Sequence, residues 1–143
     1  MARISLAEAN RMISAALARG EESGFKPLSV SVLDAGGHII AFQRQDGASN
    51  LRYQIATGKA YGALALGIGP RAVDKLARER PHFFAGLSGV SEGKIIPVPG
   101  GALVRTEAGE IIGAIGVTGD TSDNDEICAL AGVEAAGFVA DAG

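Results

Sequence analysis

Glycine is the feature that most limits what this chain can fold into. The 143 residues include 21 glycines and 25 alanines, but only seven aromatic side chains and no tryptophan. The glycines follow no period, which excludes collagen-like and linker structures. Several stand inside apolar runs such as residues 113–119, where a missing Cβ lets backbone, ligand or a second subunit approach closely. Because large side chains are scarce, we expect burial between subunits to add stability, and the chain to form a homo-oligomer.

Length and composition define one domain, spanning residues 1–143, and exclude several classes of protein. Hydrophobic residues make up 47% and charged residues 20%, with a net charge of −3, which argues against disorder and against a dedicated nucleic-acid binder. No apolar stretch is long enough to cross a membrane, and the start of the chain lacks the apolar segment of a signal peptide. One cysteine, Cys128, cannot close an internal disulfide. The sequence therefore predicts a reduced, cytoplasmic protein without a membrane partner.

Hydrophobic periodicity predicts helices and strands in an α+β order. Ser5 and Glu8 form a capping box at the start of the first helix, and Asp123 or Asn124 is the expected cap of the last. Pro81 is expected to end a helix and leave His82 in a loop. The expected helices span residues 5–20, 50–66, 70–80 and 124–140. The expected strands span residues 28–33, 38–43, 94–98, 102–106 and 110–117. Strand pairs flanked by helices favour a central antiparallel sheet of about five strands.

Two features of the sequence allow both a structural and a binding interpretation. Lys59 lies at the edge of the apolar stripe of its helix, so its ammonium either reaches solvent or points into a pocket where it holds an anion. Pro99, Gly100 and Gly101 either form a tight turn or expose two glycine amides to a carboxylate or phosphate.

Motifs for metals, nucleotides and nucleophilic catalysis are missing from the sequence. Residues 120–126 are rich in oxygen ligands but lack the spacing of a calcium loop, so helix capping explains them better. His38 and His82 lack a third partner for zinc, and no metal site is predicted. No phosphate-binding loop and no GxSxG motif occurs. The residues identify no nucleophile–base pair and leave open whether the chain is an enzyme.

An ordered set of motifs resembles one known family. It runs through 32-VLDAGG-37, 44-RQDGA-48, Lys59-Ala60, 97-PVPGG-101 and 112-IGAIGVTG-119, and ends at Asp125-Glu126. In order and extent the set is similar to the GlcG/HbpS-like family, described as heme-degrading or heme-binding, to which the C-terminal domain of PduO belongs. The resemblance implies a profilin-like antiparallel sheet, homo-oligomers and a heme or corrinoid ligand. It also implies a heme-ligating histidine in the first helix, and residues 5–20 contain none.

Two functions follow from the residues and the resemblance together. The first is a small-ligand-binding protein that takes heme or a related tetrapyrrole. The second is an enzyme or accessory protein acting on a small anionic catabolite from a hydroxy-acid, diol or aromatic pathway. For either function we expect one cleft that binds its ligand through Arg44, Lys59, Pro99, Gly100 and Gly101. The candidate catalytic residues are Asp46, Lys59, Asp125 and Glu126, because proton transfer needs a titratable group at a desolvated site.

Overall fold

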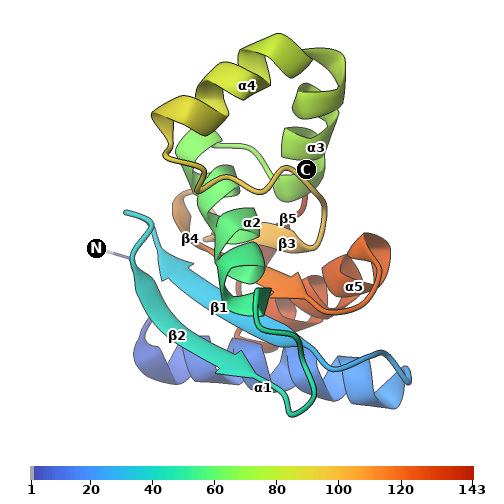
Figure 1. The fold of residues 1–143 in the computed structure, drawn as a ribbon. Helices are drawn as coiled ribbons and strands as arrows, with labels where there is room; N and C mark the ends of the chain where they lie inside the picture. Colours follow the sequence, from blue (N-terminus) through green and yellow to red (C-terminus); the bar gives the residue numbers. More distant parts are fainter. Residues whose placement is uncertain (1) are drawn as a thin grey trace.

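A five-stranded antiparallel sheet forms the centre of the molecule in the computed structural model, which describes residues 2–143. The strands lie side by side in the order β2-β1-β4-β3-β5, as Figure 1 shows. Their bounds are β1 Ser29–Asp34, β2 Ile39–Arg44, β3 Gly101–Arg105, β4 Ile111–Thr118 and β5 Val139–Asp141. The predicted α+β class and strand number are confirmed.

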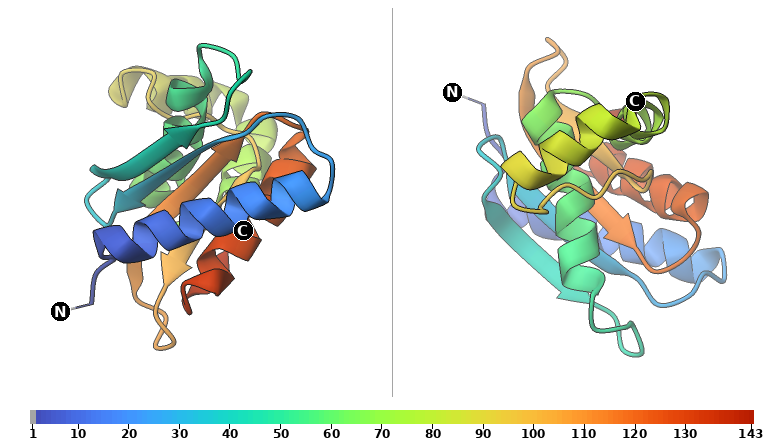
Figure 2. Two further views of the ribbon diagram at one scale, coloured as in Figure 1. Left: turned by 90° about the horizontal axis from the view of Figure 1, so that it is seen from below. Right: turned by 45° about the horizontal axis from the view of Figure 1, so that its top comes forward.

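Helices cover both faces of the sheet. On one face lie α1 (Leu6–Glu22) and α5 (Ser122–Ala135), which are on the viewer's side of the sheet in the left view of Figure 2. On the other lies α2 (Arg52–Leu66), followed by α3 (Pro70–Glu79) and α4 (Pro81–Val90). The larger core, with Met12, Ile13, Val30 and Ile115 among its members, lies on the α1 and α5 side. The α2 side is packed by smaller residues such as Ala60, Ala63 and Ala114.

Small residues allow α2 to pack closely against the sheet. A Cβ on Gly116 of β4 would overlap the carbonyl oxygen of Ala56 in α2, so this glycine sets the helix-to-sheet distance. The alternating serines of β1 also face α2, and both Ser29 and Ser31 are fully buried. Ser31 Oγ lies 2.8 Å from Thr57 Oγ1. The expected half-buried strand is therefore buried on both faces, because a helix covers its polar side.

The strand expected over residues 94–98 is absent, and the segment crosses α2 instead (Figure 1). Its Ile96 N–H donates to Gly58 O of α2 at 3.2 Å. Pro97 and Pro99 have no N–H to give to a ladder, so the segment cannot join the sheet as an inner strand. We call residues 93–98 the strap.

The fifth strand comes from the end of the chain, where the sequence predicted helix. Helix α5 ends at Ala135, Gly137 adopts a positive φ of 81°, and β5 then pairs with β3. Arg105 Nε holds Asp141 Oδ2 at 3.0 Å across this pair.

Three predictions about helix ends have mixed outcomes. The capping box of Ser5 and Glu8 is confirmed. The cap of α5 is Thr121, whose hydroxyl accepts from the Asn124 amide at 3.2 Å, and not Asp123 or Asn124. Pro81 begins a helix instead of leaving His82 in a loop, because proline is well tolerated in the first turn.

Candidate functional site

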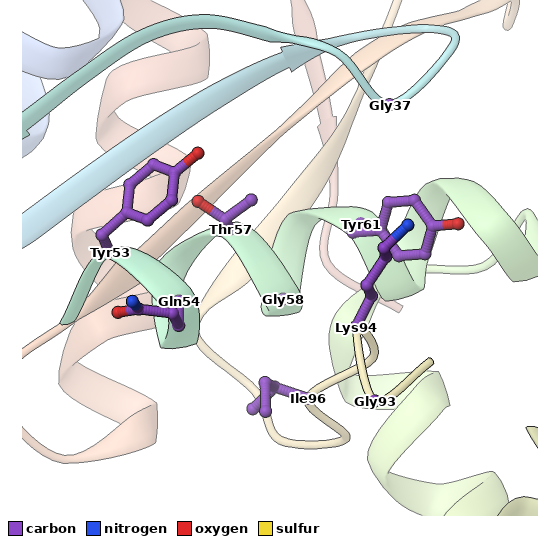
Figure 3. A pocket seen from close by; sticks show the side chains of 9 residues that line it. All are labelled: Gly37, Tyr53, Gln54, Thr57, Gly58, Tyr61, Gly93, Lys94 and Ile96. Atoms are coloured by element: carbon purple, nitrogen blue, oxygen red, sulfur yellow. The ribbon is translucent and has the colours of Figure 1, made fainter. Parts of the chain in front are cut away.

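A cavity of about 420 Å³ opens between α2, the strap and the β1–β2 turn. Figure 3 shows its side chains: Tyr53, Gln54, Thr57 and Tyr61 come from α2, while Lys94 and Ile96 come from the strap. The glycines at its wall are Gly37, Gly58 and Gly93. The volume falls within the range of about 300–1,000 Å³ that is usual for small-molecule pockets.

Local packing fixes the walls of this cavity. The rings of Tyr53 and Phe42 meet edge to face with centroids 4.9 Å apart, a favourable aromatic geometry. A Cβ on Gly58 would clash with Ile96 and come within 3.0 Å of Lys94 O, so glycine lets the strap lie directly on the helix. Lys94 Nζ lies 5.9 Å from the centroid of the Tyr61 ring. The cavity thus combines two aromatic rings with one cation.

Lys59 and Asp125, both predicted as site residues, do come together, but in the protein interior. Lys59 Nζ donates to Asp125 Oδ2 at 3.2 Å and to Val117 O at 2.9 Å, and only 3% and 2% of the two side chains are exposed. Asp125 Oδ1 accepts from the Asp120 amide at 3.0 Å. Lys59 is therefore sheltered from bulk water, but its ammonium contacts a carboxylate and a carbonyl and does not line the α2 cavity.

Burial and mutual pairing shift the pKa values of Lys59 and Asp125 in opposite directions. Burial lowers the pKa of Lys59 and raises the pKa of Asp125, since a poorly solvated site disfavours both charges. The mutual attraction and the hydrogen bonds work the other way and hold the charged forms. The pair joins α2 to the first turn of α5 across the end of β4.

Gly100 completes the surroundings of the Lys59 ammonium. Its φ is +121°, and a Cβ there would lie 2.6 Å from Lys59 Nζ. Pro99, Gly100 and Gly101 are all buried, and a Cβ on Gly101 would lie 2.5 Å from Ile115 O and 3.1 Å from Pro70 Cγ. Because α3 and β4 cover this segment, the amides of Gly100 and Gly101 are not exposed, and of the two interpretations of residues 99–101 the buried turn fits the structure.

The remaining predicted residues lie elsewhere. Arg44 and Asp46 border a separate hollow beside Leu17 and Phe25, on the α1 side of the molecule. The structure does not gather them with Lys59 and Gly100 into one cleft.

Glu126 is engaged in an ion pair with α3. Its carboxylate accepts from Arg71 Nε at 3.0 Å, and Arg71 also holds Asp123 at 2.6 Å. The two carboxylates raise the pKa of Arg71 still further above its ordinary range. Glu126 thus fastens α5 to α3.

The side chains that line the α2 cavity are not among the site residues predicted from the sequence. Tyr53, Thr57 and Tyr61 recur at spacings of four along the helix, which is one turn. That stripe is the signal that could have found them. Lys94 and Ile96 carried no such signal, since the residues around them were expected to form a strand.

The chain belongs to the HbpS-like family, described as haem-degrading proteins, whose family model matches residues 4–134. A Citrobacter freundii relative, an uncharacterized 15.0 kDa protein in the dhaT-dhaS intergenic region, is 33% identical over 129 residues. That match covers 90% of this chain and 89% of the relative.

Solved structures share the fold. The PduOC:heme complex superposes with a TM-score of 0.86 at 23% identity, over 98% of this chain and 99% of that one. The Klebsiella pneumoniae protein ORFY also gives 0.86, at 28% identity, over 96% of this chain and 93% of that one. HbpS gives 0.80 at 27% identity, over 94% and 90% of the two chains.

Residues 2–143 lack two kinds of structural feature. No group of three or more His, Cys, Asp or Glu side chains comes together in a way that could hold a metal ion. No helix in that range has the length and apolar character needed to cross a membrane.

Proposed function

We propose that the α2 cavity binds a flat, mostly apolar molecule with an acidic substituent, and that heme is the ligand it takes. The observation that carries the proposal is the pairing of two aromatic walls, Tyr53 and Tyr61, with Lys94 at one rim. Rings stack on a planar ligand, and the ammonium pairs with a carboxylate. Membership of the HbpS-like family supports heme within this class.

The residues of the cavity fit heme in two respects. In a third they differ from the histidine ligation that the family resemblance implies. The aromatic walls suit the macrocycle, and Lys94 suits a propionate. Neither His38 nor His82 lines the cavity, so one tyrosine phenol, that of Tyr53 or Tyr61, would hold the iron while the other ring stacks on the macrocycle. When bound, heme supplies an iron that accepts a tyrosine ligand.

The alternative function, chemistry on a small anionic catabolite, gains less from the geometry. Of its candidate catalytic residues, Lys59 and Asp125 are paired with each other in the interior and Glu126 is paired with Arg71. We assign these three residues a structural role, and Asp46 lies apart from them.

We further propose that the protein is a cytoplasmic homo-oligomer. Apolar side chains remain exposed on several elements, among them Leu51 at 65%, Val90 at 85% and Leu6 at 59%. Burying such side chains between copies would add to a core made largely of small residues. Light scattering at micromolar concentration should give a mass above 14.5 kDa, and the monomer mass would contradict this.

Titration with hemin, followed at the Soret band, tests the proposal. We expect saturable binding that Lys94→Gln weakens about three- to tenfold, while Lys75→Gln on exposed α3 leaves it unchanged. Tyr53→Phe and Tyr61→Phe should together weaken hemin but spare iron-free protoporphyrin, because only the iron needs a phenol. Hemin binding that none of these variants changes would show that the ligand lies elsewhere.

A further inference from the structure

Helix α4 directs an apolar face away from the rest of the molecule. The helix has ten residues, Pro81–Val90, of which only Phe84 is buried, where it packs against α3. Figure 1 shows the helix at the outer edge of the molecule, beside α3. Phe83 is 38% exposed and Val90 is 85% exposed. Two large apolar side chains of this helix therefore lie in water.

The structure leaves room for a second helix on this face. A Cβ on Gly89 would meet nothing within 4 Å, so no other part of the described chain lies over it. At the edge of the face, the Arg80 guanidinium lies 4.4 Å from the centroid of the Phe83 ring. This cation–π contact holds the ring in place. The face is therefore open, and its largest side chain is already positioned for a contact.

The charge of this face indicates what covers it. Within residues 81–91 the only titratable side chain is that of His82. A strongly acidic or basic partner would find no opposite charge there, whereas two identical neutral faces meet without repulsion. The face therefore suits a second copy of this chain better than a charged protein or a nucleic acid.

Phe83 and Val90 are placed so that the face complements itself. They are seven residues apart, which is two turns, so they lie on one side of α4 and about 10 Å apart along its axis. Suppose that two copies of the helix cross antiparallel about a two-fold axis at the middle of α4. Phe83 of one copy then meets Val90 of the partner subunit, and the reverse pair forms as well. One symmetric arrangement thus covers both exposed side chains in both copies.

We propose that α4 is the surface through which two copies of this chain associate, antiparallel, with Phe83 packed on Val90 of the partner subunit. The inference rests on the homo-oligomer proposed above and adds where two copies meet. Neither side chain lines the α2 cavity. One face of a helix about 15 Å long buries less than the roughly 800 Å² per partner of a standard interface, so we expect this contact to form in the micromolar range.

Disulfide cross-linking of the full chain tests the register. A chain carrying both Phe83→Cys and Val90→Cys is compared, after mild oxidation, with chains carrying either substitution alone. Within one chain the two positions are too far apart for a disulfide, whereas the proposed pairing brings them together between copies. The native Cys128 is buried. We expect a covalent dimer from the double variant and at least tenfold less from either single variant. Equal yields, or no covalent dimer from the double variant, would overturn the proposal.

Analytical ultracentrifugation separates this contact from the homo-oligomer itself. Val90→Lys puts a charge into the contact at a helix C-terminus, where a lysine is well tolerated, and should raise the dissociation constant at least tenfold. Leu6→Lys, at another exposed apolar residue, is the matched control and should associate like wild type. If Val90→Lys associates like wild type, or if both variants lose association equally, α4 is not the contact and the homo-oligomer stands. A wild-type chain that stays monomeric contradicts both proposals.

Discussion

At the scale of single residues, burial decides which charged groups can serve a ligand. Lys59 has its ammonium 3.2 Å from Asp125 and 2.9 Å from the Val117 carbonyl, so its charge is used inside the protein. Lys94, by contrast, forms only an exposed ion pair with Glu92 at 3.9 Å, which water screens, so its charge is accessible to an anion that enters the cavity.

Removing one partner of the buried pair should be strongly destabilising. Lys59→Ala leaves the Asp125 carboxylate buried without its counter-ion, which we expect to cost about 3–5 kcal/mol of the free energy of unfolding. Chemical denaturation measures this. Lys75→Ala removes an exposed ion pair with Glu79 and should cost at most about 1 kcal/mol. A Lys59→Ala variant no less stable than Lys75→Ala would contradict the structural role.

Gly116 offers a second test, of packing between α2 and the sheet. A methyl group there would overlap the Ala56 carbonyl, so Gly116→Ala should lower the free energy of unfolding by at least about 1–3 kcal/mol. Gly86 in α4 has open space around its missing Cβ, and Gly86→Ala should stabilise the helix by about 0.5–1 kcal/mol. Thermal unfolding of both variants checks the opposite signs, and equal signs would be inconsistent with this packing.

At the scale of elements, α2 and the strap together build the site. The helix supplies Tyr53, Thr57 and Tyr61 to the cavity and Lys59 to the interior. The strap closes the cavity and touches the helix at Gly58, where Ile96 N–H donates to Gly58 O.

A side chain at Gly58 should loosen the strap. Gly58→Ala would place a methyl group against Ile96 and the Lys94 carbonyl, so the strap must move away from the helix. We expect faster amide hydrogen exchange at Ile96 and across residues 93–98, with the central strands unchanged. Gly86→Ala serves as the control. Unaltered exchange at Ile96 would mean that the strap does not depend on this contact.

Elements governed by local signals could be predicted from the sequence, and those governed by distant partners could not. The capping box at Ser5, the turn between β1 and β2, and the periodicity of α2 all lie within a few neighbouring residues. The strap has the composition of a strand, but its Ile96 amide donates to Gly58 O of α2, 38 positions earlier in the chain. The residues of β5 continue the helical pattern of the preceding segment. They form a strand because β3 offers an edge with which they pair.

The candidate site shows the same division. The motifs around Lys59, Gly100 and Asp125 do meet in space. The sequence could not show that Lys59 and Asp125 pair with each other and leave no group free for a ligand. Exposure is a property of the whole fold: Gly101 is covered by Pro70 of α3, which lies 31 positions earlier.

At the scale of the whole molecule, acid should weaken the fold through two partly exposed aspartates, Asp34 and Asp120. Hydrogen bonds from the Lys26 amide and the Asn124 side chain lower the pKa of Asp120, and those from the His38 and Gly36 amides lower the pKa of Asp34. A lowered pKa in the folded state gives stability that is present above the ordinary value of about 4 and lost as the pH falls through the lower folded value. Asp125, whose pKa is raised, acts in the opposite sense.

A comparison with one variant isolates the contribution of Asp120. Asp120→Asn should be less stable than wild type at pH 7, and the difference should shrink as the pH falls below about 4. Urea denaturation at several pH values measures the difference. A gap that stays constant down to pH 2 would mean that the Asp120 charge is not involved.

The central claim, that the α2 cavity holds the ligand, is tested most directly by filling it. Gln54 lines the cavity, is exposed and makes no side-chain hydrogen bond within the described chain, so Gln54→Trp should occupy the space without disturbing the core. Glu134→Trp, on exposed α5, controls for the added ring. In a hemin titration, the account predicts that Gln54→Trp loses at least tenfold in affinity while Glu134→Trp binds like wild type. Equal affinity of Gln54→Trp and wild type would contradict it.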